Sequence, residues 1–497
     1  MLKSYFTNSI WVLGGNLIAK LLNLLTLSAL GRILNPKWFG VYNLAYSYAE
    51  SLSQMADLGT SIVVQRSFAN ATPQESIKLS ARFFGGGLII LGFYCLAFSV
   101  YLFHKKYYSP LYLKEYWSVY SIYILFISLG SRLSQFALIP IMGLKDFKAF
   151  SIRNVLCTFV VSIFVSLGAL KFELLGSLQA LLLATVLNVV ITFLVFSRIA
   201  KKFSIRFSLM KSIHAIPEVL REGFILYSGS TFGGSLYSLV CLSLITQYIK
   251  VEEYNFVRIG LSIGSFVNVF VAATQPVTFS FLSESASHVD HEKLKSFKVR
   301  VLFSIIVLIV MWLIAFNDLI TTLLFGRIYM DSKVYVSIIL VILLVQVINQ
   351  FYTAFLVARG LANFIGFISV LCVGISIISA IVLIPYLGLL GYLISFSSGY
   401  IIGLGILFRK ENQVENYKDK NRIKVVFISS FFMVFTTFAL TYAIDYVSRF
   451  GVMVMFTLFW LWLFRKIALL DSEFSLMQNK FSEIKNKILS KGIVKKT

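Results

Sequence analysis

The sequence is poor in charged residues and has no long polar segment. Only 13% of its 497 residues are Asp, Glu, Lys or Arg, whereas 58% are hydrophobic and the mean hydropathy is +0.83. A water-soluble chain of this length needs far more polar surface, so the composition excludes a soluble globular protein. No polar stretch is long enough to form a separate domain outside a membrane.

Cysteines and catalytic motifs are also scarce. The four cysteines, Cys95, Cys157, Cys241 and Cys372, have no metal or redox spacing and all fall in hydrophobic segments. The sequence lacks a Walker-type phosphate loop, an HExxH zinc motif and a nucleophile elbow. We therefore expect no catalytic residue, no metal and no cofactor, and an ATP-driven pump would need a partner subunit.

Long hydrophobic runs fill most of the chain. Stretches of about 20 apolar residues, the length at which a helix crosses a bilayer, recur throughout the sequence. They predict fourteen transmembrane helices, over residues 8–33, 38–65, 82–104, 116–140, 151–171, 174–197, 222–248, 254–280, 299–317, 334–358, 362–385, 387–408, 424–444 and 449–468. Helices are expected because unpaired backbone groups cannot face lipid, and the alternating pattern of a β-barrel is not visible. The predicted fold class is all-α integral membrane.

The first six predicted helices have a weak copy later in the chain. Three pairs of segments align: 26–45 with 241–260, 143–150 with 360–367, and 174–176 with 389–391. The numbering offset is 215 for the first and third pairs and 217 for the second. Repeats of this length made of hydrophobic spans are typical of transporters with two pseudo-symmetric halves.

The repeat predicts the domain organisation. Two six-helix lobes are expected over residues 1–205 and 206–412, followed by two additional transmembrane helices over 413–470. Because six is an even number, both lobes begin on the same side of the membrane and are related by an axis along its normal. Residues 471–497 are expected to form an amphipathic basic tail on the inner leaflet.

The basic residues that give the chain its net charge of +23 also predict how it is oriented in the membrane. Most of the 45 Lys and Arg fall in the two termini and in the even-numbered loops of the predicted topology. By the positive-inside rule, both termini are expected in the cytoplasm, with anionic membrane lipids as secondary partners. Nucleic-acid binding is not expected.

Several charged side chains fall inside predicted spans, where each costs roughly 2.5–3.5 kcal/mol at mid-bilayer. Lys20, Glu50 and Arg132 are expected at a similar depth, with Asp57 nearer the cytoplasm. Lys20 and Glu50 either form an ion pair that joins two helices or handle a ligand or ion. Asp57 either is solvated, caps a neighbouring helix or carries an ion. Arg132 has no obvious partner on its own helix, which favours a functional role.

The second lobe provides an internal comparison. At positions matching Lys20, Glu50, Asp57 and Arg132, the second lobe has Ser235, Ser265, Ala272 and Asn349. The fold therefore does not require these charges, and one-sided charge on a symmetric architecture indicates ligand or ion handling. The predicted substrate-binding residues are Lys20, Arg132, Asn16, Asn23, Tyr46, Gln54, Gln135, Asn268, Gln275, Asn349 and Gln350. The predicted ion-coupling residues are Glu50 and Asp57. Small polar residues also serve as ordinary contacts between packed helices.

The segment GRILNPKWFGVYNLAYSYAESLSQMADLGTSIVVQRSFA at 31–69 carries a family resemblance. Its Gly-Arg with an apolar pair, aromatic-Gly-x-Tyr helix start and Asp-Leu-Gly resemble the N-terminal signature of polysaccharide flippases of the O-antigen (Wzx) type. That family belongs to the multidrug/oligosaccharidyl-lipid/polysaccharide exporter superfamily. The resemblance implies two lobes around a central cavity that move undecaprenyl-diphosphate-linked oligosaccharide, as in lipopolysaccharide biosynthesis, from the inner to the outer leaflet of the bacterial cytoplasmic (inner) membrane.

The resemblance also implies roles and partners. Lys20 and Arg132 would bind the anionic diphosphate, and Glu50 or Asp57 would carry H⁺ or Na⁺. Polysaccharide assembly proteins would be partners, and the protein would be a transporter rather than an enzyme. Two alternatives stay open. A drug/cation antiporter of the same superfamily would prefer a cavity dominated by acids and aromatics. A membrane-embedded glycan polymerase would usually present a large external catalytic loop.

Overall fold

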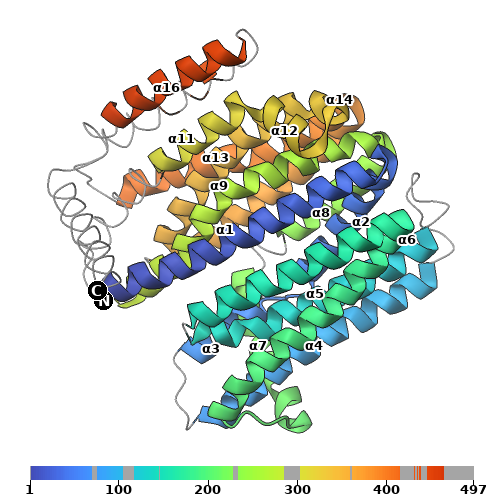
Figure 1. Cartoon of the computed structure of the whole chain (residues 1–497). Coiled ribbons are helices and arrows are strands. Elements are labelled where there is room, and N and C mark those ends of the chain that lie inside the picture. The colour runs from blue at the N-terminus through green and yellow to red at the C-terminus, as the bar shows by residue number, and fades with distance from the viewer. Residues whose placement is uncertain are drawn as a thin grey trace, which may run out of the picture. The chain divides into compact units, whose positions relative to one another are not determined.

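The computed structural model describes residues 2–69, 75–104, 117–144, 146–227, 233–284, 303–358, 361–414 and 445–463, with residues 430, 434, 436 and 437. Every element within these residues is a helix (Figure 1). The chain divides into two compact units, residues 1–284 with 317–413, and residues 285–316 with 414–497. Six helices of the described part are long and apolar enough to cross a membrane, or seven if a bent pair counts as one span.

The first unit contains the whole first copy of the predicted repeat and the second copy without its residues 285–316, which belong to the second unit. The first copy forms α1 (Leu2–Ile33), α2 (Pro36–Met55), α3 (Thr60–Ala69), α4 (Ser76–His104), α5 (Trp117–Gly143) and α6 (Phe147–Lys202). Within the first unit, the second copy forms α7 (Leu209–Tyr227), α8 (Gly233–Tyr248), α9 (Val251–Glu284), α12 (Asn317–Phe325), the 3₁₀ helix η4 (Arg327–Ser332), α13 (Lys333–Ala358) and α14 (Ala362–Val414).

The helix bounds repeat at a constant interval. The same numbering offset of 215 relates four pairs of bounds: the ends of α1 and α8, the starts of α2 and α9, the ends of α5 and α13, and the starts of α6 and α14. Two matching backbone hydrogen bonds, Asp146 N to Ile141 O at 3.2 Å and Leu361 N to Leu356 O at 3.1 Å, follow α5 and α13. The offset of 217 expected for the segment 143–150 is therefore wrong.

The constant offset changes one pairing between the lobes. It makes Val347 the counterpart of Arg132, and it makes Asn349 the counterpart of Ser134. Val347 is completely buried among the helices of the first unit. The expected match of Asn349 with Arg132 is thus wrong by two positions, although the second lobe still carries no charge there.

α6 and α14 are each two antiparallel spans joined by a tight reversal. The backbone leaves the helical region at Glu173 (φ 48°, ψ −129°) and, at the matching position of the second copy, in nearly the same conformation at Gly388 (φ 56°, ψ −128°). A Cβ atom added to Gly168 would collide with the carbonyl oxygen of Gly176. Residues eight apart in a continuous helix are separated by about 12 Å, so the chain must fold back here. This agrees with the four separate spans predicted for these segments.

The expected helix over 38–65 is interrupted. Ala56, Asp57, Leu58 and Gly59 divide it into α2 and α3. The expected helix over 222–248 corresponds to the end of α7 and to α8, and α7 begins earlier than expected. α7 packs against α3 and α4 (Figure 1), with apolar contacts to both.

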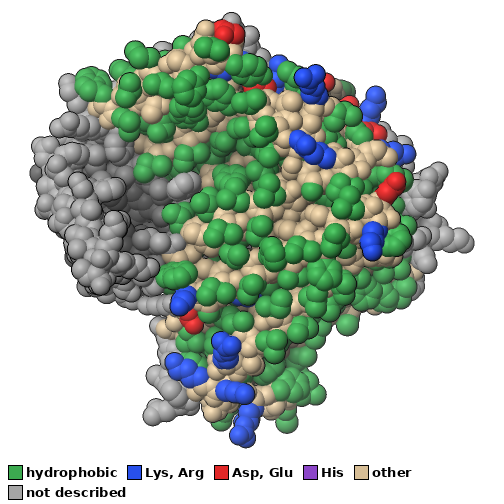
Figure 2. Space-filling view, viewed as in Figure 1, with side chains coloured by type: hydrophobic (Ala, Val, Ile, Leu, Met, Phe, Trp, Pro, Cys, Tyr) green, Lys and Arg blue, Asp and Glu red, His purple; other side chains and the backbone are tan. Residues whose placement is uncertain are grey.

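On the face of the molecule that Figure 2 shows, hydrophobic side chains are spread over most of the surface of the described helices. On α6, Leu167, Leu170 and Leu194 are each more than half exposed. Such continuous apolar exposure is destabilising in water and is expected for surfaces that face lipid.

The second unit contains α11 (Phe303–Ala315) and α16 (Tyr446–Leu463). Hydrogen bonds join them, from Trp460 Nε1 to Ser304 O at 3.0 Å and from Arg449 to Ala315 O at 2.9 Å. The predicted tail 471–497, and all but four residues of the predicted span 424–444, lie outside the described residues.

Candidate substrate site

Three charged side chains from α1, α2 and α9 form one cluster. Glu50 on α2 and Arg258 on α9 form an ion pair, with 3.8 Å between Oε2 and the guanidinium nitrogen. Lys20 on α1 interacts electrostatically with both of them. Two cations and one carboxylate give this cluster a formal charge of +1. Among the described residues, Glu50 forms its ion pair with Arg258 and not with Lys20. The alternative of an ion pair between Lys20 and Glu50 is therefore wrong.

Aromatic residues hold Arg258 in place. Its guanidinium lies 4.8 Å from the ring centroid of Tyr46, a cation–π contact. Tyr42 stacks on Tyr46 with 6.4 Å between ring centroids. Tyr46 and Glu50 are four residues apart, so they lie on one face of α2 and reach Arg258 together. The arginine is thus oriented by one ring and one carboxylate before any ligand arrives.

The cluster is accessible from outside the protein core. The side chain of Glu50 is 48% exposed and that of Arg258 is 21% exposed, while Lys20 and Tyr46 are partly buried. A charged group in this position can bind a ligand that enters between the helices. An arginine provides a planar fork of N–H donors suited to phosphate oxygens, and a lysine adds a compact positive charge.

Arg258 is absent from the residues predicted for the site. It is the single charged residue of the predicted span 254–280, and a lone charge inside a transmembrane span is enough to mark it as a candidate functional residue. The comparison between lobes starts from the charges of the first lobe, and the counterpart of Arg258 there is the neutral Asn43. Arg258 is therefore a charge of the second lobe that has no charged counterpart in the first.

Arg132 and Asp57, both predicted for the site, bind each other. They form an ion pair in which the side chains are only 6% and 10% exposed. Asp57 Oδ1 also accepts hydrogen bonds from Thr60 Oγ1 at 3.0 Å, Ser61 N at 3.1 Å and Ser61 Oγ at 2.6 Å. Asp57 therefore caps the N-terminus of α3, the capping alternative among those considered. A functional role is expected for Arg132 from the sequence because its own helix offers no partner. Its partner is Asp57, at the break between α2 and α3, so that reason no longer applies.

The Asp-Leu-Gly motif forms the break between α2 and α3. Leu58 and Gly59 both have positive φ angles, 45° and 80°. A Cβ atom at Gly59 would collide with the carbonyl oxygen of Gly223 on α7. Glycine is required at this position both for its backbone conformation and for the close approach of α7.

The Gly-Arg motif connects α1 to α12. Arg32 donates from Nε to the carbonyl oxygen of Leu324 at 2.8 Å and from a terminal nitrogen to that of Leu323. These carbonyls belong to the last turn of α12, where a cation also interacts favourably with the helix dipole. A Cβ atom added to Gly31 would lie 3.1 Å from a ring carbon of Phe325 on α12, so the two helices approach closely here. Both signature motifs thus have structural roles.

The remaining predicted residues are distributed over α1, α2, α5, α9 and α13. Asn349 donates to Tyr400 O at 2.8 Å and Val345 O at 3.2 Å, so it joins α13 to α14. Asn16 accepts from Asn154 at 3.2 Å, and Asn268 Oδ1 has no hydrogen-bond partner in the described part. Of the others, Asn23, Gln54 and Gln135 are exposed, Gln350 is partly buried, and the side chain of Gln275 lies outside the described residues.

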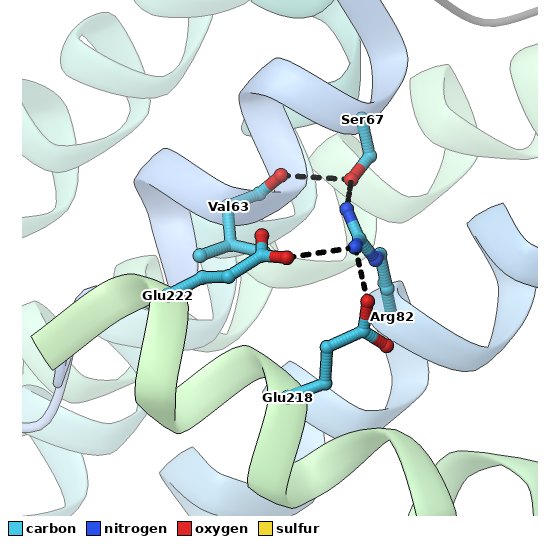
Figure 3. Close-up of polar contacts among 5 residues, drawn as sticks. All are labelled: Val63, Ser67, Arg82, Glu218 and Glu222. Atoms are coloured by element: carbon cyan, nitrogen blue, oxygen red, sulfur yellow. Dashed lines mark hydrogen bonds and ion pairs between the residues drawn. The ribbon is translucent and has the colours of Figure 1, made fainter.

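A separate polar cluster fixes α7 to the first lobe's helices (Figure 3). Arg82 on α4 forms ion pairs with Glu218 at 2.5 Å and Glu222 at 3.0 Å, both on α7. It also donates to Ser67 Oγ on α3 at 2.9 Å, and Ser67 in turn donates to Val63 O at 2.9 Å. Arg82 is largely buried and connects three helices, which is a structural role.

Comparison with known proteins gives a family match and several structural matches. The family model described as polysaccharide biosynthesis protein matches residues 6–279, a range that includes the whole charged cluster. No curated protein matches the chain.

Solved structures share the fold at low sequence identity. A lipid II flippase MurJ in an inward closed conformation is 15% identical, with 92% of this chain and 98% of that chain covered and a TM-score of 0.58. A MATE protein in complex with MaL6 is 14% identical, with 85% and 96% covered and a TM-score of 0.57. A MOP superfamily transporter from Pyrococcus furiosus is 15% identical, with 85% and 96% covered and a TM-score of 0.54. At this identity the likeness shows the fold, the all-α architecture of this transporter superfamily.

Proposed function

The chain belongs to the polysaccharide biosynthesis protein family, and on that premise we propose that it is a flippase for a lipid-linked oligosaccharide. The substrate is an undecaprenyl-diphosphate-linked repeat unit of an O-antigen or similar surface polysaccharide. It moves from the inner to the outer leaflet of the bacterial cytoplasmic membrane by alternating access, and both termini of the protein are cytoplasmic. The observation that carries this proposal is the positive cluster of Lys20 and Arg258 around Glu50.

The chemistry of the cluster suits a diphosphate. Charge-assisted hydrogen bonds from an arginine to phosphate oxygens are strong and can form in pairs. Arg258 is held against the ring of Tyr46, so less conformational freedom is lost when the phosphate binds. Lys20 adds a second cation from a different helix. The prenyl chain remains in the lipid, against the apolar outer faces of the helices.

Glu50 is the proposed carrier of a coupling H⁺ or Na⁺. It is the carboxylate of the cluster and is half exposed, so an ion can reach it. Asp57 is less suited to this role, because it is buried, forms an ion pair with Arg132 and accepts hydrogen bonds at the N-terminus of α3.

A drug/cation antiporter is the second candidate, since MATE proteins share the fold. A cationic drug would be bound best by a site with excess negative charge. The cluster instead has two cations and one carboxylate, which disfavours this candidate. A glycan polymerase finds no support in the described residues, where no catalytic constellation is visible.

The test is complementation of a flippase-deficient strain that makes a known lipid-linked repeat unit. The wild-type chain should restore surface glycan, whereas Arg258→Ala and Lys20→Ala should not, at equal protein level in the membrane. An exposed cation away from the cluster, Lys37, provides the matched control for loss of charge. Full complementation by both cluster variants would contradict the proposal.

A further inference from the structure

The first two turns of α7 have one packed face and one uncovered apolar surface. The packed face lies on α4, where a Cβ atom added to Gly85 would collide with the carbonyl oxygen of the completely buried Ser212. The remaining surface carries Leu209, Met210 and Ile213, each at least half exposed. The described residues therefore leave the apolar surface at the start of α7 uncovered.

The segment before α7 is also fixed to α4. The backbone N–H of Arg206 donates to Ser80 Oγ at 3.2 Å. The rings of Phe207 and Phe84 meet edge to face, with 5.0 Å between their centroids, although Phe207 is still more than half exposed. The start of α7 thus presents its apolar side chains from a backbone that is held in place, so less freedom is lost when they contact a partner.

An open pocket of about 570 Å³ lies where α4 and α7 begin. It combines an apolar lining with a polar one, which are Ile77, Ala81 and Met210, and Glu75, Lys78, Lys211 and His214. The volume is in the range of sites for small ligands. Because Met210 belongs to both, the pocket is continuous with the uncovered apolar surface of α7.

Positive charge predominates in the pocket. Lys78 and Lys211 are exposed, and neither forms an ion pair within the described residues. Glu75 is the one carboxylate of the lining, so the formal charge is +1 with a neutral His214. Three further exposed cations come shortly before α7 in the chain: Lys201, Lys202 and Arg206. The charge of the pocket therefore complements an anionic ligand.

The proposed orientation places this pocket at the inner leaflet. All of its lining residues fall within residues 66–81 and 198–221, which are two cytoplasmic loops of the predicted topology. The cytoplasmic leaflet contains anionic lipids, whose surface potential attracts basic segments. Amphipathic helices at this level bury their apolar side about 5–10 Å into the boundary of headgroups and acyl chains.

We propose that the pocket and the start of α7 form a docking site for an anionic phospholipid of the inner leaflet. Lys78 and Lys211 bind the phosphate of the headgroup. Leu209, Met210 and Ile213 enter the lipid, and the apolar lining of the pocket contacts the glycerol and the first acyl carbons. Free phosphate would use the lysines alone, so the apolar lining favours a lipid. The site does not depend on which substrate the protein transports.

Binding is tested by thermal unfolding of the full chain in detergent with added phosphatidylglycerol or phosphatidylcholine. Phosphatidylglycerol should raise the unfolding temperature more, and Lys78→Ala with Lys211→Ala should lower the apparent affinity for it about tenfold or more. The matched control is Lys37→Ala with Lys250→Ala, which removes two exposed lysines outside the pocket and should leave the affinity unchanged.

A second variant changes the affinity in the opposite direction. Glu75→Gln removes the carboxylate that opposes an anion in the pocket, so it should strengthen binding of phosphatidylglycerol several-fold. This variant keeps the test decisive if the double alanine variant unfolds, because a gain of affinity is expected only from an anion site. An affinity that is unchanged by Glu75→Gln would contradict the proposal.

Insertion of the apolar surface is measured separately. In a chain whose four native cysteines are replaced by serine, Met210→Cys carries an environment-sensitive fluorophore, and the protein is reconstituted in vesicles of phosphatidylglycerol and phosphatidylcholine. Spin-labelled lipid should quench this fluorophore several-fold more than one on Lys202→Cys, an exposed polar position at the end of α6. Equal quenching at the two positions would overturn the insertion of α7.

Inorganic phosphate distinguishes a lipid from a soluble anion. It should stabilise the protein far less than phosphatidylglycerol does at the same concentration, because it cannot use the apolar lining. Equal stabilisation by the two would make the pocket a phosphate site and refute the lipid. None of these measurements uses a lipid-linked oligosaccharide, so the docking site and the proposed function can fail independently.

Discussion

Glu50 and Arg258 belong to different copies of an internal repeat, yet they face each other across 3.8 Å. Each is charged where the other copy is neutral, since Glu50 corresponds to Ser265 and Arg258 to Asn43. The two charges are therefore not a duplicated pair. Each copy contributes one of them, and the fold brings them together at the contact between α2 and α9.

Replacing Arg258 should impair transport in a graded way. Arg258→Ala removes the charge and should lower transport about tenfold or more, since a hydrogen bond to a charged group contributes about 1.5–3 kcal/mol. Arg258→Lys keeps the charge but loses the fork geometry and the stacking on Tyr46, and should lie between alanine and wild type. The measurement is surface glycan at matched protein level. Equal transport by the lysine variant and wild type would mean that geometry is unimportant.

The ion pair of Arg132 and Asp57 should act on stability rather than on the substrate. Arg132→Ala leaves a buried carboxylate without its ion-pair partner, which costs about 3–5 kcal/mol and should reduce protein abundance and thermal stability in detergent. Arg132→Met combined with Asp57→Asn should recover much of this loss, since asparagine can still cap α3. If the double variant is abundant but inactive, the pair has a direct role in transport.

Gly59→Ala should be destabilising. The φ angle of 80° is strained for alanine, and the added methyl group collides with Gly223 on α7. Strain of this kind costs on the order of 1–3 kcal/mol, and relief requires α7 to move away from α3. Thermal unfolding in detergent measures the effect, with Gly14→Ala as control because, apart from the adjacent backbone of its own helix, no atom lies within 4 Å of its Cβ position. Equal stability of the two variants would contradict the argument.

The topology predicts a specific reporter pattern. Fusions at Lys202 and Lys295 should report cytoplasmic positions, and fusions at Lys106 and Lys250 should report external ones. Lys250 separates α8 from α9, so its position also fixes the side of the membrane on which α9 begins. A cytoplasmic signal at Lys250 would contradict the six-plus-six arrangement and with it the parallel repeat.

The helical architecture and the repeat could be predicted because both leave local signals. Long apolar runs predict spans, and the recurring segments predict an offset of 215 that the helix bounds share. The family resemblance read from residues 31–69 is confirmed by the family match over residues 6–279.

The partners of the buried charges could not be predicted in the same way. Arg132 and Asp57 are 75 residues apart, and Glu50 and Arg258 lie on different copies of the repeat. Helical periodicity places a residue on a face but does not say which helix that face meets. The break at Leu58 and Gly59 is not predicted either, because the apolar pattern continues through it and a positive φ angle at leucine has no sequence signal.

The contact of Gly59 with Gly223 has a mechanical consequence. α7 is the first helix after the end of the first repeat copy, yet its backbone touches the turn that begins α3, and Arg82 holds two of its carboxylates from α4. In the proposed alternating access, a helix so fastened would move together with α3 and α4. The boundary between the moving parts would then fall after α7, whereas the duplicated sequence begins again before it. Duplication and motion would therefore divide this chain at two different places.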